Sequence, residues 1–173
     1  AELVRMINTA VTITDRPSAF RYPRGNGLGV ELPEINKILE IGKGKIVKDG
    51  NKVAILNFGG RLQECLKAAD KLDAKGIFTT VADARFAKPL DQKLIMDLCL
   101  NHEVIITIEE GSIGGFGSHV FQMLSERGFF DKGLKIRSMI LPDQFIEQDT
   151  PENMYKTAGL NAQAIEQKAL DAL

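Results

Sequence analysis

The residues best suited to chemistry form one short segment near the N-terminus, Ala19-Phe20-Arg21-Tyr22-Pro23-Arg24-Gly25-Asn26-Gly27. We expect a short strand over 19–22, because Pro23 favours an extended conformation for the residue before it. The glycines that follow Arg24 allow the backbone to approach a ligand closely. A guanidinium beside such a turn can bind a phosphate through two parallel hydrogen bonds. The same arginines could instead pair with surface carboxylates, and the spacing alone leaves both interpretations open.

A second glycine-rich segment, Gly111-Ser112-Ile113-Gly114-Gly115-Phe116-Gly117, lies between an apolar run and an amphipathic one. A turn from a strand into a helix can present free amides to an anion. The spacing, however, matches neither the dinucleotide-binding fingerprint nor the phosphate-binding loop of nucleotide hydrolases. We therefore interpret the segment as a tight strand-to-helix turn.

The remaining candidates indicate no catalytic, metal-binding or cofactor-binding residue. Glu109 and Glu110 are adjacent on an expected strand, so their side chains should point to opposite faces and could not act together on one substrate. His102 and His119 have no partner at metal-ligand spacing. The two cysteines are isolated in apolar helical patterns, which is typical of buried, reduced thiols.

The charge and hydropathy patterns argue against nucleic acid and membranes as partners. The chain has 22 basic and 23 acidic residues and a formal net charge of -1, without the basic stripe that nucleic-acid binding requires. No apolar run reaches the roughly 18–20 residues that span a membrane, and the N-terminus lacks the features of a signal peptide. We expect a cytoplasmic protein that binds neither nucleic acid nor membranes.

The order of apolar patterns predicts a three-layer α/β/α fold around a mixed, mostly parallel sheet. A helix over 1–14 begins without an initiator Met or a capping residue, so we expect the chain to be a C-terminal fragment of a longer protein. Asp49-Gly50 predicts a hairpin joining strands over 45–48 and 52–57. Further strands are expected over 77–81, 103–108 and 135–141, and helices over 62–72, 92–100, 115–127, 151–158 and 162–172.

Several blocks resemble 1-deoxy-D-xylulose-5-phosphate synthases, which are thiamine-diphosphate enzymes of the transketolase superfamily. The likeness begins at Ser18 and the arginine segment and runs in order through nearly the whole chain. The other blocks are Gly29-Val30-Glu31-Leu32, Ile41-Gly42-Lys43-Gly44, Ala54-Ile55-Leu56-Asn57-Phe58-Gly59, Asp83-Ala84-Arg85-Phe86-Ala87-Lys88-Pro89-Leu90-Asp91, Thr107-Ile108-Glu109-Glu110-Gly111 and Leu141-Pro142-Asp143-Gln144-Phe145-Ile146.

The resemblance implies a parent enzyme that condenses pyruvate with glyceraldehyde 3-phosphate, releasing CO2, in the supply of isoprenoid, thiamine and pyridoxal precursors. Thiamine diphosphate and magnesium would bind in the parent's other regions, and this fragment would be inactive by itself. Residues 1–33 would end the pyrimidine-binding domain, and residues 34–173 would form the transketolase-type C-terminal domain, which supports a homodimer. Arg24 matches the family's arginine for the phosphate of glyceraldehyde 3-phosphate.

Two other interpretations stay open at this point. The Arg-Tyr-Pro-Arg-Gly element also resembles one in the β subunits of 2-oxoacid dehydrogenases. Alternatively, the chain could be a free-standing α/β regulatory module that binds an anion at its glycine loop.

Overall fold

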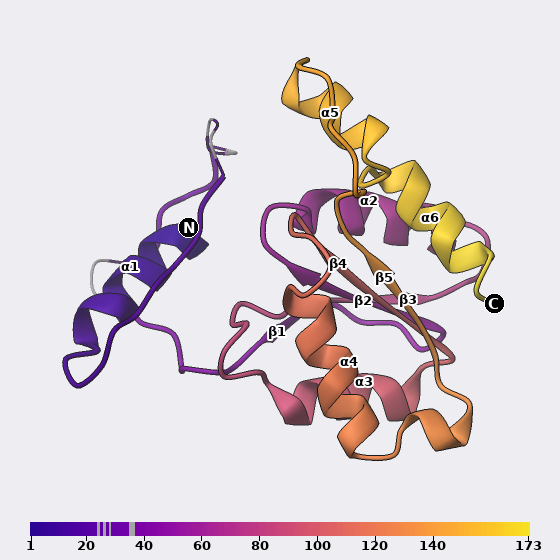
Figure 1. Ribbon diagram of the computed structural model, residues 1–173, viewed down its shortest axis with the longest axis horizontal. Coiled ribbons are helices and arrows are strands. Elements are labelled where there is room, and N and C mark those ends of the chain that lie inside the picture. Colours follow the sequence, from indigo (N-terminus) through magenta and orange to yellow (C-terminus); the bar gives the residue numbers. More distant parts are fainter. Residues whose placement is uncertain (24, 26, 28, 35–36) are drawn as a thin grey trace.

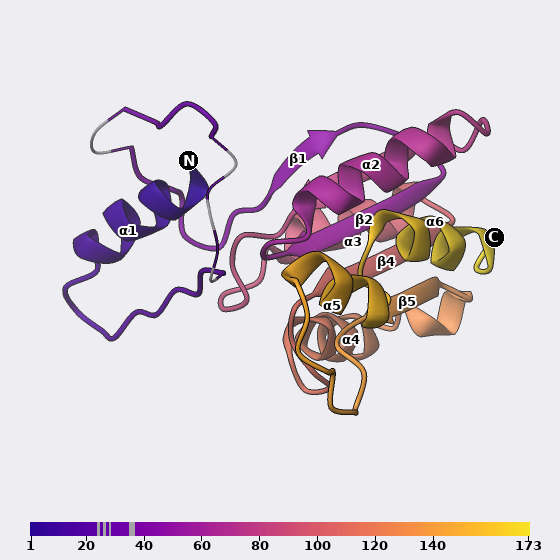
Figure 2. The same cartoon turned by 90° about the horizontal axis from the view of Figure 1, so that it is seen from above.

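The computed structural model describes residues 1–23, 25, 27, 29–34 and 37–173. Helix α1 (Glu2–Thr12) confirms the predicted N-terminal helix. The expected strand over 19–22 is wrong, because the described residues between 13 and 44 form neither helix nor strand. An extended segment becomes a strand only when a neighbour pairs with its backbone, and no described strand runs beside this one. Figures 1 and 2 show α1 and this segment at one side of the sheet, where the chain enters β1.

The remainder of the chain forms a five-stranded sheet in the order β1-β3-β2-β4-β5. Strands β2, β3, β4 and β5 are mutually parallel, and β1 runs antiparallel to β3. The sheet is therefore mixed and mostly parallel, as predicted. The strands are β1 (Lys45–Lys48), β2 (Val53–Phe58), β3 (Thr79–Asp83), β4 (Val104–Glu109) and β5 (Lys135–Met139).

The predicted hairpin between β1 and β2 is wrong. Strand β2 lies at the centre of the sheet, with β3 on one side and β4 on the other, so neither of its edges is open to β1. The chain instead crosses β3 at Gly50, whose N–H and C=O both contact the Thr80 hydroxyl, at 2.9 and 3.0 Å. A Cβ at Gly50 would lie 2.4 Å from the Thr79 backbone, so only glycine fits this crossing.

Helices cover both faces of the sheet, which completes the three layers (Figures 1 and 2). Helix α2 (Leu62–Asp73) and helix α6 (Ala162–Leu170) pack on one face, and α3 (Gln92–Asn101) and α4 (Phe116–Glu126) pack on the other. The short helices η1 (Phe130–Lys132) and α5 (Pro151–Thr157) precede β5 and α6. Continuous apolar runs in β2 and β4 match this double coverage, because both faces of a central parallel strand are buried.

An exposed charge network joins three strands at the edge of the sheet opposite their carboxyl ends. The Glu103 carboxylate accepts hydrogen bonds from Lys135, the first residue of β5, and from Lys52, which directly precedes β2. These two contacts, Lys135 first, lower the pKa of Glu103 from 4.5 to about 2. The network fixes the amino ends of these strands. Doubly wound sheets bind ligands at the opposite, carboxyl edge, so the search for a functional site begins there.

Candidate functional site

Arg24, the one residue predicted to contact substrate, lies outside the described residues. Its neighbour Arg21 is described, and its guanidinium carbon lies 5.1 Å from the centre of the Phe58 ring. Phe58 ends β2 and stacks on Phe116 of α4, with ring centres 4.8 Å apart. The arginine segment is therefore held against the carboxyl edge of the sheet through a cation–π contact.

The carboxyl end of β3 carries the strained residue Arg85. Its φ of 58° is the one positive value among the described non-glycine residues, a conformation that costs about 1–3 kcal/mol. Two hydrogen bonds hold the bend, from Arg85 N to Asp83 Oδ1 at 3.1 Å and from Ala84 N to Asn57 O at 2.8 Å. Asp83 is buried, and burial raises the pKa of its carboxyl group.

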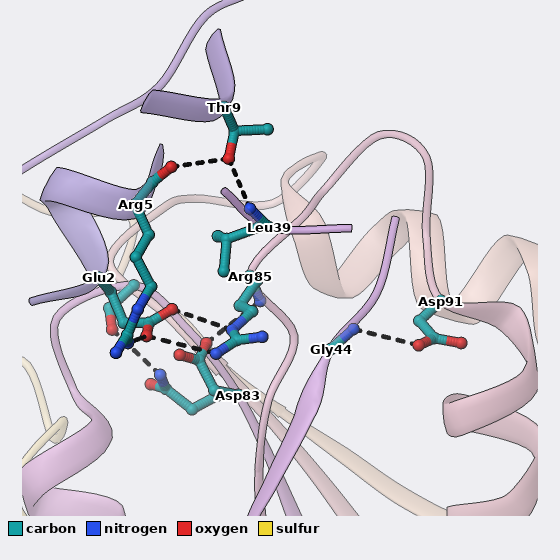
Figure 3. Close-up of polar contacts among 10 residues, drawn as sticks. Glu2, Arg5, Thr9, Leu39, Gly44, Asp83, Arg85 and Asp91 are labelled. Carbon is teal, nitrogen blue, oxygen red and sulfur yellow. Dashed lines mark hydrogen bonds and ion pairs between the residues drawn. The ribbon is translucent and has the colours of Figure 1, made fainter. Parts of the chain in front are cut away.

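The Arg85 side chain reaches from this bend to the start of α1 (Figure 3). Its Nε lies 2.9 Å from Oε2 of Glu2, and its Nη2 donates to Oε1 at 3.3 Å. The 2.9 Å contact is misaligned for a hydrogen bond, so neither of these two buried atoms has a hydrogen-bond partner. The attraction between them is that of an ion pair. Arg5 also donates to Glu2. The contact ties α1 to the edge of the sheet.

Two further contacts in Figure 3 fix the chain between α1 and β1. The Thr9 hydroxyl donates to Arg5 O at 2.7 Å and accepts from Leu39 N at 2.8 Å. Asp91 caps α3 through Oδ1 and accepts from Gly44 N through Oδ2 at 3.1 Å. The chain just before β1 is thus held at Leu39 and at Gly44.

The two carboxylates at the end of β4 diverge, as the strand periodicity predicted. Glu110 accepts from Gly60 N at 3.1 Å and from Arg61 Nε at 3.0 Å. The Arg61 guanidinium lies 3.4 Å from the centre of the Tyr155 ring. Burial, followed by the hydrogen bond to Glu110, raises the pKa of Tyr155. This cluster links β2, β4 and α5 across nearly a hundred residues of sequence.

Glu109 turns to the other face and organises the glycine loop. Its side chain is buried, and its Oε1 accepts from Gly117 N at 2.8 Å, in the first turn of α4. A Cβ at Gly111 or Gly115 would lie 2.4 or 2.5 Å from its Oε2. The anion at this helix N-terminus is therefore the chain's own carboxylate, which agrees with the prediction of a tight strand-to-helix turn.

The histidines and cysteines have no partners for chemistry among the described residues. His102 contacts the Thr80 hydroxyl at 2.7 Å and the Leu98 carbonyl at 2.9 Å, both within the fold. Cys65 and Cys99 are free and buried in the cores on opposite faces of the sheet. Burial raises the pKa of Cys99 to about 12 and that of Cys65 still higher, so both thiols remain protonated and weakly nucleophilic.

Residues 42–165 match the family model described as "Transketolase, C-terminal domain". The chain belongs to the transketolase C-terminal domain family. A solved structure described as "Split gene transketolase, inactive beta4 tetramer" is similar, with 30% sequence identity and a TM-score of 0.72. The match covers 83% of this chain and 46% of that one, so this chain spans about half the length of the structure it resembles.

Transketolase C-terminal domain membership confirms the predicted fold class and the superfamily. Within the part of the chain that the structure describes, no helix is both long and apolar enough to span a bilayer. The same residues bring together no group of three or more His, Cys, Asp or Glu side chains that could hold a metal ion. Sequence reasoning missed Arg61 and Tyr155, because their partners are distant in sequence and no motif marks them.

Proposed function

We propose that this chain is the C-terminal part of a 1-deoxy-D-xylulose-5-phosphate synthase. That enzyme condenses pyruvate with glyceraldehyde 3-phosphate and releases CO2, in the supply of isoprenoid, thiamine and pyridoxal precursors. The observation that carries the proposal is the Arg-Tyr-Pro-Arg-Gly-Asn-Gly segment at 21–27, upstream of the transketolase C-terminal domain at 42–165. The Asp-Gln-Phe-Ile block at 143–146 and the Gly-Asn-Gly block at 25–27 together favour this enzyme over its relatives.

The proposal divides the chain into two functional parts. Residues 1–33 end the pyrimidine-binding domain and bring Arg24 to the substrate, and residues 34–173 form the C-terminal domain that supports a cytoplasmic homodimer. The ion pair between Arg85 and Glu2 joins the first part to the carboxyl edge of the second. This contact supports the proposal that the two parts act together. The tetrameric assembly named for the similar structure supports association of chains of this kind.

Thiamine diphosphate and magnesium do not fit the residues of this chain. The described side chains form no candidate metal site, and the sequence lacks the Gly-Asp-Gly…Asn element that holds the metal and the diphosphate. The glutamate that activates the aminopyrimidine is missing as well. We therefore assign the cofactor, and the carbanion chemistry that it supplies, to the parent's other regions.

The role of Arg24 is to hold the phosphate of the acceptor aldehyde. A guanidinium presents its donors in a planar fork that matches phosphate oxygens. The packing of Arg21 on Phe58 supports this role, because it fixes the backbone three residues before Arg24. Arg21 is thus a positioning residue for the segment and Arg24 is the substrate ligand.

The test uses the complete parent enzyme with the Arg24→Ala substitution. A hydrogen bond to a charged group contributes about 1.5–3 kcal/mol, so the catalytic efficiency for glyceraldehyde 3-phosphate should fall about 10- to 150-fold. The Michaelis constant for pyruvate should change little. Unphosphorylated glyceraldehyde, which has no phosphate to bind, should be used almost equally by the variant and the wild type.

Arg21→Ala is the matched control, because it removes the same group from the same segment. We expect it to lower the efficiency for both aldehydes together through looser positioning. If Arg24→Ala also lowers both together, Arg24 is a structural residue and the proposed role is wrong. If the parent transfers its two-carbon unit to a lipoyl domain and not to glyceraldehyde 3-phosphate, the chain belongs to a 2-oxoacid dehydrogenase.

A further inference from the structure

A cavity of about 420 Å³ opens beside the glycine loop, between α4 and the end of β5. This volume lies within the range of small-molecule sites, about 300–1,000 Å³. Ile113, Phe121 and Ile140 supply apolar side chains to its lining, and Ser138 adds a hydroxyl group. Glu109 also lines the cavity and is the one ionisable side chain that does so among the described residues.

Glu109 is a buried carboxylate without a cationic partner. The residue is 2% exposed, and no described lysine, arginine or histidine forms an ion pair with it. The N-terminus of α4 offsets only about half a unit of charge, through the hydrogen bond from Gly117 N to Oε1. Buried charges are ordinarily paired, because burying one without a partner is unfavourable. The site therefore lacks a positive group.

The two carboxylate oxygens of Glu109 differ in their partners. Oε2 receives no hydrogen bond from the described residues, yet it is not among the side-chain atoms that are sealed from solvent without a partner. It lies against the Cα atoms of Gly111 and Gly115, where a side chain at either position would collide with it. The glycines thus leave room for this acceptor, and Glu109 itself lines the cavity beside the apolar side chains.

We propose that this cavity binds a primary ammonium group at the end of an aliphatic chain. The ammonium donates to the Glu109 carboxylate and to the Ser138 hydroxyl, and the methylene groups pack on Ile113, Phe121 and Ile140. A free alkylamine and the side chain of a partner's lysine share this chemistry. The site lies on the α4 face of β4, whereas Glu110 and Arg61 lie on the other face.

Isothermal titration calorimetry of the full chain with n-butylammonium chloride at constant ionic strength tests the proposal. The wild type should show saturable binding, and Glu109→Gln should weaken it about 10- to 150-fold, because a charge-assisted hydrogen bond is lost. Glu110→Gln removes a charge from the adjacent residue, which faces away, and should change affinity less than twofold. Unchanged binding in Glu109→Gln would overturn the proposal.

A series of ligands tests the same site in the wild type alone, in case Glu109→Gln does not fold. Lengthening the amine by one methylene should improve affinity about three- to fourfold until the apolar wall is covered. Uncharged n-butanol should bind at least tenfold more weakly than n-butylammonium. Equal affinity for the two, or no saturable binding at millimolar amine, would refute the assignment.

A third arm distinguishes the two sources of the ammonium group. N-acetyl-lysine methylamide carries the same alkylammonium group on a peptide backbone. Tighter binding of this compound than of n-butylammonium supports a lysine side chain of a partner as the occupant. Tighter binding of the free amine supports a small-molecule ligand.

Discussion

Gly115→Ala should destabilise the protein through one collision, between the new methyl group and the buried carboxylate of Glu109. The Cβ would lie 2.5 Å from Oε2, 2.8 Å from Oε1 and 2.9 Å from Cδ. The backbone at Gly115 has a φ of -82°, which alanine adopts without strain. The cost is therefore steric, and its size depends on whether Glu109 can move.

Glu109 cannot move without losing its own contacts. Its side chain is buried, and displacing the carboxylate would break the 2.8 Å hydrogen bond from Gly117 N, which contributes about 1.5–3 kcal/mol as a bond to a charged group. Overpacking in a filled interior costs about 1–3 kcal/mol. Because a domain of this size loses about 2–4 °C per kcal/mol, the melting temperature should fall by about 2–12 °C.

A double-mutant cycle measured by urea unfolding identifies the cause. In a Glu109→Ala background the carboxylate is absent, so adding Gly115→Ala should cost little, and the coupling energy should reach about 1–3 kcal/mol. Gly114→Ala is the control in the same loop, because its φ is 93° and nothing lies within 4 Å of its Cβ. Its cost is conformational, about 1–2 kcal/mol, and should add to that of Glu109→Ala. If Gly115→Ala costs the same with and without Glu109, the loop's glycines are not there to accommodate the carboxylate.

Three other predictions concern contacts that hold the layers and the N-terminal segment. Because the folded state lowers the pKa of Glu103, its contribution to stability is complete above 4.5 and disappears as the pH falls towards 2; urea unfolding of wild type and Glu103→Gln should converge over that range. Asp91→Ala should cost about 1–2 kcal/mol in the same assay through loss of the α3 cap, with a further loss from Gly44, while Asp91→Asn should cost less. Breaking the ion pair with Arg85→Met or Glu2→Gln should speed amide exchange in α1 by roughly fivefold, the effect of about 1 kcal/mol, and leave exchange in α6 unchanged.

The sequence pattern predicted the layers because burial on both faces leaves a clear mark. The runs 53–58 and 104–109 are apolar at nearly every position, and both form central strands with parallel neighbours. The hairpin failed for the opposite reason. Asp49-Gly50 signals a chain reversal, but which strand receives β1 depends on tertiary pairing that no local signal records. Here β3 offered an open edge and β2 did not.

At the candidate site, the sequence predicted which face of the sheet each side chain lies on, but not which residues it contacts. The two-residue period of a strand places Glu109 and Glu110 on opposite faces, and the structure confirms it. The partners of Glu110 are Arg61, 49 positions away, and Tyr155 on a different helix. The left-handed backbone of Arg85 could not be predicted, because a hydrogen bond to Asp83 fixes that conformation and arginine is not a residue type that favours it.

The carboxyl edge of this sheet is filled by the chain's own charged groups. In doubly wound sheets that edge ordinarily receives a ligand, yet here Glu110 is neutralised by Arg61 and Arg85 by Glu2. Arg61 also contacts Tyr155 of α5, and the Glu2 that pairs with Arg85 belongs to α1. These contacts hold α5 and α1 in place. An edge used in this way positions neighbouring segments. Glu109 has no cationic partner among the described residues and lines a cavity, which is why that cavity is the place to search for a ligand.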